Sequence, residues 1–191
     1  MRKFILGIVN LPAMIYNFLF LKLRKVQYGK NLCISGRICI RGKGIYVIGE
    51  NVIINSKPFE NPTACGYMTS LNCFNGATII IGNNVGISHT AISAMEKVEI
   101  GDNVLIGSNC MIADTDFHPI DTEKRIANDR TAIKTAPIKI ENNVFIGARS
   151  IILKGVTIGE NSIVGAGSVV TKTIPANEIW AGNPAKFIKK I

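Results

Sequence analysis

The sequence predicts an all-β protein built as a parallel β-helix, and two observations lead to this fold class. Aliphatic residues recur every six positions without a slip, at Ile140, Ile146, Ile152, Ile158, Val164 and Val170. Three positions after four of these residues stands Asn or Gly, which adopt positive φ at low cost: Asn143, Gly155, Asn161 and Gly167. A period of six fits a short strand plus a turn, with three sides closing one coil. We therefore expect Ile140 and Ile158 to stack one coil apart.

The fourth position after each aliphatic residue is also small, at Val144, Ser150, Val156, Ser162 and Ser168. A small side chain there keeps each corner of the coil narrow, which favours a closed prism with the aliphatic residues inside. The repeat by itself predicts a stable scaffold and leaves the activity open.

Composition bounds the kind of protein and its partners. The chain has 191 residues, of which 47% are hydrophobic and 18% charged, so it is long enough for one domain with a core and too apolar for disorder. Its net charge of +9 is compatible with nucleic acid, an anionic membrane surface or a phosphate-bearing cofactor. No nucleic-acid-binding motif accompanies the charge, so we do not expect nucleic acid as a partner.

The cysteines and histidines restrict the chemistry further. The five cysteines include no C-x-x-C pair, so we expect reduced, mostly buried thiols in a cytoplasmic protein, with Cys110 at an interior position of the coil. The two histidines are His89 and His118. An all-His zinc site needs three ligands, so we expect no metal unless subunits share ligands.

Residues 1–27 form an apolar N-terminal segment. The stretch 4–21 carries no charge, and basic residues flank it at Arg2, Lys3, Lys22, Arg24 and Lys25. This stretch barely reaches the roughly 20 residues that a spanning helix needs. Pro12 suits a first helical turn, so we expect a helix over 12–24, with 7–11 leading into it. Three roles stay open: a helix lying on a membrane or a partner, at the inner face of the membrane; a helix packed only on its own protein; and a span or signal.

The other repeats define a β-helix domain over residues 28–175, followed by a basic tail over 176–191. The pattern begins near Gly29 and fails over 55–76, where we expect a loop or a distorted coil. It resumes at Ile81 and stops again in a polar insert over 113–137. This insert contains His118 and is too long for a corner, so we expect it to carry function.

Several stretches together resemble a known family. They are the repeat block, DTDFHPID in the insert, GVTIGENSIVGAGSVVTKTIPAN and the ending AGNPAKFIKK. In combination they are similar to the left-handed β-helix acetyltransferases, in particular the maltose and galactoside O-acetyltransferases and the capsule and lipopolysaccharide O-acetyltransferases. The resemblance covers about residues 28–191. It implies a left-handed coil, a homotrimer with sites at subunit interfaces, and acetyl-CoA as the acetyl donor.

The resemblance also assigns catalytic residues. The family uses a histidine followed by proline in an extended loop as general base, which His118 and Pro119 match. An imidazole with a pKa near 6.5 can accept the proton of a sugar hydroxyl at neutral pH. Asp114 or Asp116 is expected to orient this imidazole, although an acidic loop face is the plainer interpretation. The chain has no G-x-S-x-G motif, so we expect direct transfer without an acyl-enzyme.

By the same resemblance, acetyl-CoA runs along the coil between two subunits. The matching positions along the pantetheine arm are Ala148, Ala166 and Thr171, with Phe145 where the family has tryptophan. Lys186 and Lys189 stand where relatives use arginines near the adenosine phosphates. Lysine binds phosphate as a point charge and lacks the two parallel N–H donors of arginine. We therefore expect these substitutions to change the affinity for acetyl-CoA more than the identity of the cofactor.

His89 and Ser88 form the expected acceptor contact. They follow Ile87 on the coil, where maltose and galactoside relatives tend to keep an acceptor-binding asparagine. Two other roles stay open for His89: a structural corner residue, and the base itself, because serine acetyltransferases place their base close to this position.

These features predict an acetyl-CoA-dependent O-acetyltransferase acting on a hydroxyl of a sugar or surface glycan, in polysaccharide biosynthesis. One alternative is an N-acetyltransferase acting on an amino sugar, with the same scaffold and base. Another, from a different class, is a non-catalytic trimeric scaffold that uses the basic face and the apolar N-terminus. The intact His118 loop argues against the scaffold.

Overall fold

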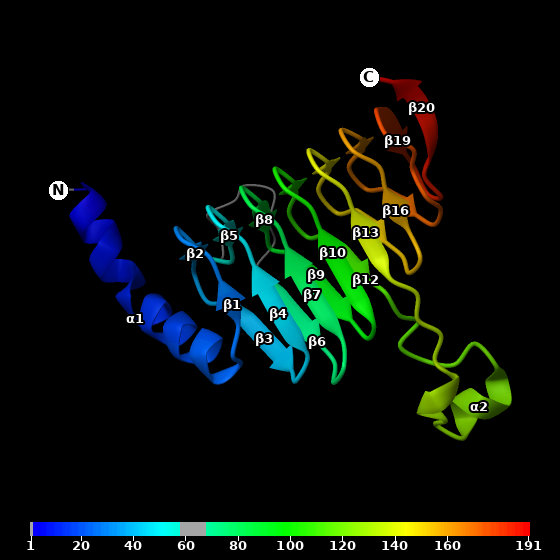
Figure 1. Cartoon of the computed structure of the whole chain (residues 1–191), viewed down its shortest axis with the longest axis horizontal. Coiled ribbons are helices and arrows are strands. Elements are labelled where there is room, and N and C mark those ends of the chain that lie inside the picture. The colour runs from blue at the N-terminus through cyan, green and yellow to red at the C-terminus, as the bar shows by residue number, and fades with distance from the viewer. Residues whose placement is uncertain (1, 58–67) are drawn as a thin grey trace.

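The computed structural model describes residues 2–57 and 68–191, with the backbone alone over 2–10, and consists of three sheets around one core (Figure 1). Sheet A contains β1 (Gln27–Tyr28), β4 (Ile45–Ile48), β7 (Thr78–Ile81), β10 (Lys97–Ile100), β13 (Ile138–Ile140) and β16 (Thr157–Ile158). Sheet B contains β2 (Cys33–Ser35), β5 (Ile53–Asn55), β8 (Gly86–Ser88), β11 (Leu105–Ile106), β14 (Phe145–Ile146), β17 (Ile163–Val164), β19 (Glu178–Ala181) and β20 (Lys186–Lys190). Sheet C contains β3 (Cys39–Gly42), β6 (Ser70–Cys73), β9 (Ala91–Ala94), β12 (Met111–Ala113), β15 (Ile151–Ile152) and β18 (Val169–Val170).

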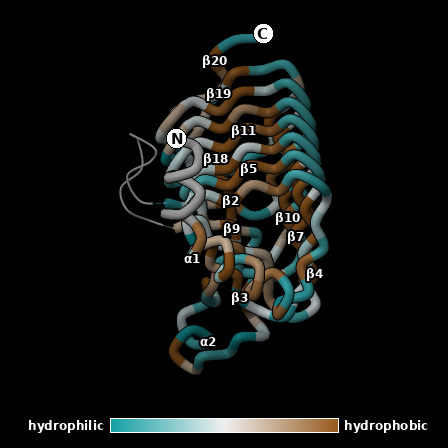
Figure 2. Tube along the Cα trace, turned by 90° about the vertical axis from the view of Figure 1, so that its left-hand side faces the viewer, coloured by the Kyte–Doolittle hydropathy of each residue, from teal (hydrophilic) through white to brown (hydrophobic). Residues whose placement is uncertain are grey.

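Consecutive strands from β1 to β18 belong to sheets A, B and C in turn, so each set of three makes one coil. Strands one coil apart pair in parallel, and Ile140 pairs with Ile158 as predicted. All six aliphatic residues of the 140–170 ladder have exposed fractions of 0%. Figure 2 shows the resulting stack of hydrophobic strand segments with hydrophilic turns at its edge. The predicted β-helix is therefore confirmed.

The corner between sheets A and B carries a ladder of asparagine side chains. Each amide nitrogen donates to the side-chain oxygen of the asparagine one coil on, over distances of 2.9–3.1 Å. Its members have φ between 56° and 61°: Asn31, Asn51, Asn84, Asn103, Asn143, Asn161 and Asn177. The positive φ predicted for these turns is thus confirmed at Asn143 and Asn161, and at Gly155 and Gly167, with 76° and 73°.

Helix α1 (Arg2–Leu23) covers the first coil, and it is longer than predicted. The expected start at Pro12 is wrong, because the helix begins at Arg2 and contains Pro12 in its interior. Pro12 removes one backbone hydrogen bond, and the helix continues through it. Asn17 is 4% exposed; its side chain donates to the Gly36 carbonyl at 2.8 Å and accepts from the Ile38 N–H at 3.1 Å.

A strand lies within the stretch 55–76, where the sequence predicted a loop or a distorted coil. Residues 58–67 of this stretch lie outside the described part, but β6 pairs in register with β3 and β9 in sheet C. Leu71 and Cys73 point into the core with exposed fractions of 0%. The coil closes tightly here, since an added Cβ at Gly42 would lie 1.8 Å from the Cys73 carbonyl oxygen.

The C-terminal tail extends sheet B, although the repeat was expected to end near residue 175. Ile174 is fully buried and bridges to Ile158, which adds one more position to sheet A. Strand β19 then pairs in parallel with β17, and β20 turns back antiparallel on β19. The last coil is incomplete and covers only part of the core. Fewer of its positions therefore need an aliphatic residue, and the hexapeptide pattern is lost.

Burial divides the cysteines that the structure describes. Cys73 and Cys110 are buried, Cys39 is half-buried and Cys33 is exposed, and all four are free thiols. The interior position predicted for Cys110 is confirmed. The prediction that the thiols are mostly buried holds for Cys73 and Cys110 but not for Cys33 and Cys39. Desolvation raises the pKa of Cys73 to about 11 and also raises that of Cys110.

Candidate active site

The insert with His118 forms a loop on a two-stranded neck. It leaves sheet C after β12 and returns at β13, and its arms are joined by an antiparallel bridge between Thr115 and Thr135. The Ala136 N–H donates to the Asp114 carbonyl at 3.0 Å. Beyond the neck the loop folds into α2 (Thr122–Ile126) and a 3-10 turn, η1 (Arg130–Ala132), and projects from the coil (Figure 1).

His118 lies on a tight turn just beyond this neck, with its side chain exposed. Its N–H donates to the Asp116 carbonyl at 2.7 Å, two residues back, and Phe117 between them has φ of 60°. This is the geometry of a γ-turn with positive φ, which is rare and strained for a bulky residue. A strained backbone conformation persists only where the surrounding structure holds it in place, and such conformations are most frequent at functional sites.

Asp116 anchors this turn to the next coil. Its Oδ1 accepts a hydrogen bond from Lys154 Nζ at 2.5 Å, and the two side chains are 23% and 28% exposed. Its Oδ2 is buried and has no hydrogen-bond partner among the described residues. The Lys154 contact therefore accounts for one carboxylate oxygen, and the orienting role expected for Asp116 stays a prediction.

Asp114 is engaged elsewhere. Its side chain is fully buried, and its two oxygens accept hydrogen bonds from the N–H groups of Met95, Glu96 and Lys97, at 2.7, 2.8 and 2.7 Å. These contacts fix the turn between β9 and β10. This geometry favours a structural role for Asp114 over the role of orienting His118.

His89 and Ser88 lie at the corner between sheets B and C. His89 is 2% exposed, has φ of 45°, and its Nε2 lies 3.0 Å from the Lys57 carbonyl oxygen. Because a carbonyl only accepts, Nε2 is the protonated ring nitrogen. Ser88 is half-buried and accepts from Asn55 at 3.2 Å. Within one chain these contacts favour the structural corner role for His89.

Two of the residues expected at acetyl-CoA lie at the ends of one row on sheet B. Phe145 pairs with Ile163, which pairs with Ile179, which in turn pairs with Lys189. Phe145 is 44% exposed, and Lys189 is exposed as well.

Ala148, Ala166 and Lys186, which are also expected at acetyl-CoA, line the corner between sheets B and C next to this row. Ala148 and Ala166 occupy equivalent places in successive coils, and the Gly167 N–H donates to the Ala148 carbonyl at 2.9 Å. An added Cβ at Gly167 would meet no atom within 4 Å, so the corner is open to solvent. Lys186 pairs with Ala181 at the top of this corner. The corner thus carries small residues with Lys186 at its top, and the adjacent row is apolar with Lys189 at its end.

Sheet C separates this surface from the His118 loop. Ala148 precedes β15, whereas Lys154 follows β15 and holds the loop through Asp116. Thr171 follows β18 at the same edge as Lys154. One chain therefore places His118 and Thr171 on the side where the strands of sheet C end. The other residues expected at acetyl-CoA lie on the opposite side, where these strands begin.

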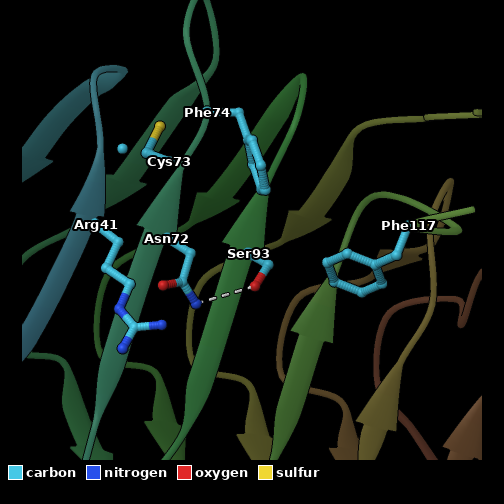
Figure 3. A pocket seen from close by; sticks show the side chains of 7 residues that line it. Arg41, Asn72, Cys73, Phe74, Ser93 and Phe117 are labelled. Carbon is cyan, nitrogen blue, oxygen red and sulfur yellow. Dashed lines mark hydrogen bonds between the residues drawn. The ribbon is translucent and has the colours of Figure 1, made fainter. Parts of the chain in front are cut away.

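A cavity of about 320 Å³ lies on the outer side of sheet C, next to the His118 loop. Its lining consists of Arg41, Gly42, Asn72, Cys73, Phe74, Ser93 and Phe117. Arg41, Asn72 and Ser93 have the same register on β3, β6 and β9, so they form a polar row across three coils. Asn72 Nδ2 donates to Ser93 Oγ at 3.3 Å, and Phe117 lies beyond the Ser93 end of this row, with Arg41 at the other end (Figure 3).

Sequence reasoning missed Lys154 and the polar row. Lys154 stands in a repeat with no special motif, and its link to Asp116 follows only from the stacking of one coil on the next. Arg41 and Asn72 align only once β6 is recognised as a strand. No group of three or more His, Cys, Asp or Glu side chains in the described ranges is placed to hold a metal.

A family model described as the hexapeptide repeat of succinyl-transferase matches residues 97–114 and 137–172. These ranges cover the coils that carry Lys154, Ala148 and Ala166. These residues therefore carry the hexapeptide repeat, and the chain is similar to hexapeptide-repeat acetyltransferases. The galactoside O-acetyltransferase of Escherichia coli K12, a curated relative, is 44% identical over 117 residues, which are 61% of this chain and 56% of that protein.

Solved structures of hexapeptide-repeat relatives share the fold over most of the chain. A maltose O-acetyltransferase from Clostridium difficile 630 is 28% identical, with a TM-score of 0.57 over 94% of this chain and 82% of that one. AntD, an N-acyltransferase from Bacillus cereus in complex with dTDP and 3-hydroxybutyryl-CoA, is 25% identical, with a TM-score of 0.71 over 92% and 88%. The chain spans 44–62% of the length of the first curated relatives that it matches.

Proposed function

We propose that this protein transfers an acetyl group from acetyl-CoA to a hydroxyl of a sugar or surface glycan, with His118 as general base. The observation that carries the proposal is the position of His118: an exposed imidazole on a strained turn, held by the Asp116–Lys154 pair, next to a cavity that Phe117 lines. The similarity to galactoside and maltose O-acetyltransferases supports a sugar hydroxyl as the acceptor.

In this mechanism His118 accepts the proton of the acceptor hydroxyl while the oxygen attacks the thioester carbonyl carbon. The new C–O bond forms as the C–S bond breaks, and the proton passes from His118 to the departing sulfur. The free Oδ2 of Asp116 is available to stabilise the imidazolium between these two transfers. No covalent intermediate with the protein is required.

The open corner fits the donor. Ala148, Ala166 and Gly167 would hold the pantetheine arm through their backbone, since small side chains let a ligand approach closely. Lys186 and Lys189, both exposed at the top of the coil, would bind the phosphates. The net charge of +9 favours such an anionic co-substrate.

We infer that the working unit is a homotrimer. Because one chain places His118 and the open corner at opposite edges of sheet C, a second copy is needed to bring a base to each donor. The projecting loop offers a contact for that copy: Ile120 and Ile126 are 66% and 81% exposed at its tip. Sedimentation should give a trimer, and a fully active monomer would contradict the shared site.

We also infer a peripheral membrane contact through residues 1–25. The described face of α1 exposes Leu11, Met14, Ile15, Phe18 and Leu19, each 50–56% exposed. No helix in the described part of the chain is long and apolar enough to span a bilayer. An apolar face with Lys22, Arg24 and Lys25 at its end suits a helix that lies on an anionic surface, and this contact would bring the enzyme to a membrane-associated glycan.

A second candidate is N-acylation of an amino sugar. It is favoured by the match to AntD, an N-acyltransferase, over 92% of this chain. An amine whose pKa lies near neutrality needs less help from a base than a hydroxyl does. Loss of His118 should therefore reduce N-transfer less than O-transfer.

The test is a thiol-release assay with acetyl-CoA and matched acceptors. Glucose, galactose and maltose offer hydroxyls alone, whereas glucosamine adds an amine. Turnover with the hydroxyl sugars, and loss of turnover in His118→Ala, is the expected result. Turnover confined to glucosamine would favour the second candidate, and no thiol release with any acceptor would favour a scaffold.

A further inference from the structure

The cavity on sheet C is built around a cation. Arg41 is exposed, and no carboxylate among the described residues forms an ion pair with it. None of the described lining residues is acidic. The nearby Asp114 carboxylate is saturated by the N–H groups of residues 95–97 and is fully buried. The Arg41 guanidinium is therefore free to meet an anion.

The backbone beneath this guanidinium is fixed from two sides. The Tyr46 hydroxyl donates to the Arg41 carbonyl oxygen and accepts from the Cys73 N–H at 3.0 Å. Arg24 Nη1 donates to the carbonyl of Gly42 at 3.1 Å. These contacts fix the position of the backbone from which the Arg41 side chain extends.

The rest of the lining suits a sugar. Asn72 and Ser93 continue the row from Arg41 and present an amide and a hydroxyl at their 3.3 Å contact (Figure 3). Phe74 and Phe117 are 38% and 40% exposed and offer apolar faces. A sugar ring presents the matching combination of hydroxyls and an apolar C–H face, and the cavity has the volume of a small ligand pocket.

Positive charge continues beyond Gly42. Gly42 also lines a second hollow of about 450 Å³, together with Arg24, Lys25 and Lys43. None of the described residues that line this hollow is acidic. The acceptor's anionic end would thus point away from His118, toward the end of α1. The hydroxyl to be acetylated would lie toward Phe117, the neighbour of His118.

We propose that the Arg41 cavity is an acceptor subsite that selects sugars bearing an anionic group, a phosphate or a carboxylate. Arg41 is the specificity-determining residue, because its planar guanidinium pairs with two oxygens of either group. Asn72 and Ser93 position the ring. This inference rests on the proposed function for its reaction, but binding at the cavity can be measured without turnover.

The test compares glucose, glucose 1-phosphate and glucuronate, first by calorimetric titration and then by thiol release. The wild-type protein should bind one or both anionic sugars at least about 10-fold more tightly than glucose. Arg41→Gln should remove this preference, because both anionic sugars lose the guanidinium that pairs with them. Lys30→Gln, which removes an exposed cation outside both hollows, is the matched control and should retain the preference. The two anionic sugars separate a phosphate-binding from a carboxylate-binding subsite.

Two results would overturn the proposal: equal affinity for all three sugars, or a preference that survives Arg41→Gln. Failure of the proposed function has a different signature. Arg41-dependent binding without acetyl transfer to any sugar would refute the acetyltransferase and retain the anion subsite. Transfer to glucose and the anionic sugars with equal efficiency would retain the acetyltransferase and refute the subsite.

Discussion

Lys154 donates to Asp116 across 2.5 Å, although the two residues are 38 positions apart in the chain. Lys154 belongs to the rigid coil and Asp116 to the loop, two residues before His118. This ion pair is one of the side-chain links between the scaffold and the turn that presents His118. The position of the base thus depends on a residue one coil away from the loop.

Lys154→Met should therefore lower kcat by about 10-fold while changing the KM for acetyl-CoA little. It leaves a partly buried carboxylate unpaired, and we expect a loss of about 1–2 kcal/mol in the free energy of unfolding. Lys139→Met is the control, since Lys139 pairs with Glu141 on the exposed surface at 3.0 Å and should have little effect on either quantity. If Lys154→Met kept full kcat, the pair would not position His118.

His89→Ala should act on stability rather than on catalysis. It removes a buried ring that bonds to the Lys57 carbonyl, and we expect a cost of about 1–3 kcal/mol in urea unfolding. The acceptor KM, measured at a temperature where the variant is folded, should stay within about twofold of wild type. A KM raised by about 10-fold in a variant of unchanged stability would restore the acceptor role for His89.

Alkaline pH should destabilise the protein through Cys73 and Tyr46. Burial raises the pKa of Cys73 to about 11 and that of Tyr46 to about 12. Both groups are neutral when protonated, so the unfolded chain loses these protons at lower pH than the folded protein does. The urea midpoint should be flat below about pH 9 and fall between about pH 9 and 12, first through Cys73 and then through Tyr46. Cys73→Ala should show a shallower fall, and identical slopes would contradict the assignment to Cys73.

The double variant Met14→Ser, Phe18→Ser should reduce binding to vesicles of anionic lipid by at least about 10-fold, because it removes two exposed apolar groups from α1. Its thermal unfolding should match wild type, since neither side chain is buried. Asn17→Ala should do the reverse and destabilise the first coil while leaving vesicle binding intact. Unchanged lipid binding in the double variant would assign α1 to packing alone.

The sequence was sufficient for the coil and for the loop, because both have local signatures. Each interior residue from Ile140 to Val170 and each turn residue such as Asn143 specifies its conformation within six positions. The predicted start of α1 is wrong because Pro12, which is favoured in a first helical turn, lies in the interior of this helix. The strand β6 was missed because its coil breaks the period.

Side-chain partners were harder to predict than strands. Asp114 reaches the N–H groups of residues 95–97, His89 reaches Lys57, and Asp116 reaches Lys154. Each contact joins neighbouring coils rather than neighbours in sequence. Such contacts depend on the exact register of the stack, which the irregular stretch 55–76 interrupts for His89 and the insert over 113–137 interrupts for Asp116.

The most direct test of the account is the turnover of His118→Ala with acetyl-CoA and a sugar acceptor. We expect kcat to fall by about 100-fold or more while the affinity for acetyl-CoA stays near the wild-type value, as expected when a general base is lost. His118 is exposed, so the variant should fold normally, and its circular dichroism and sedimentation should match wild type. A variant that folds normally and retains most of its turnover would contradict the central claim.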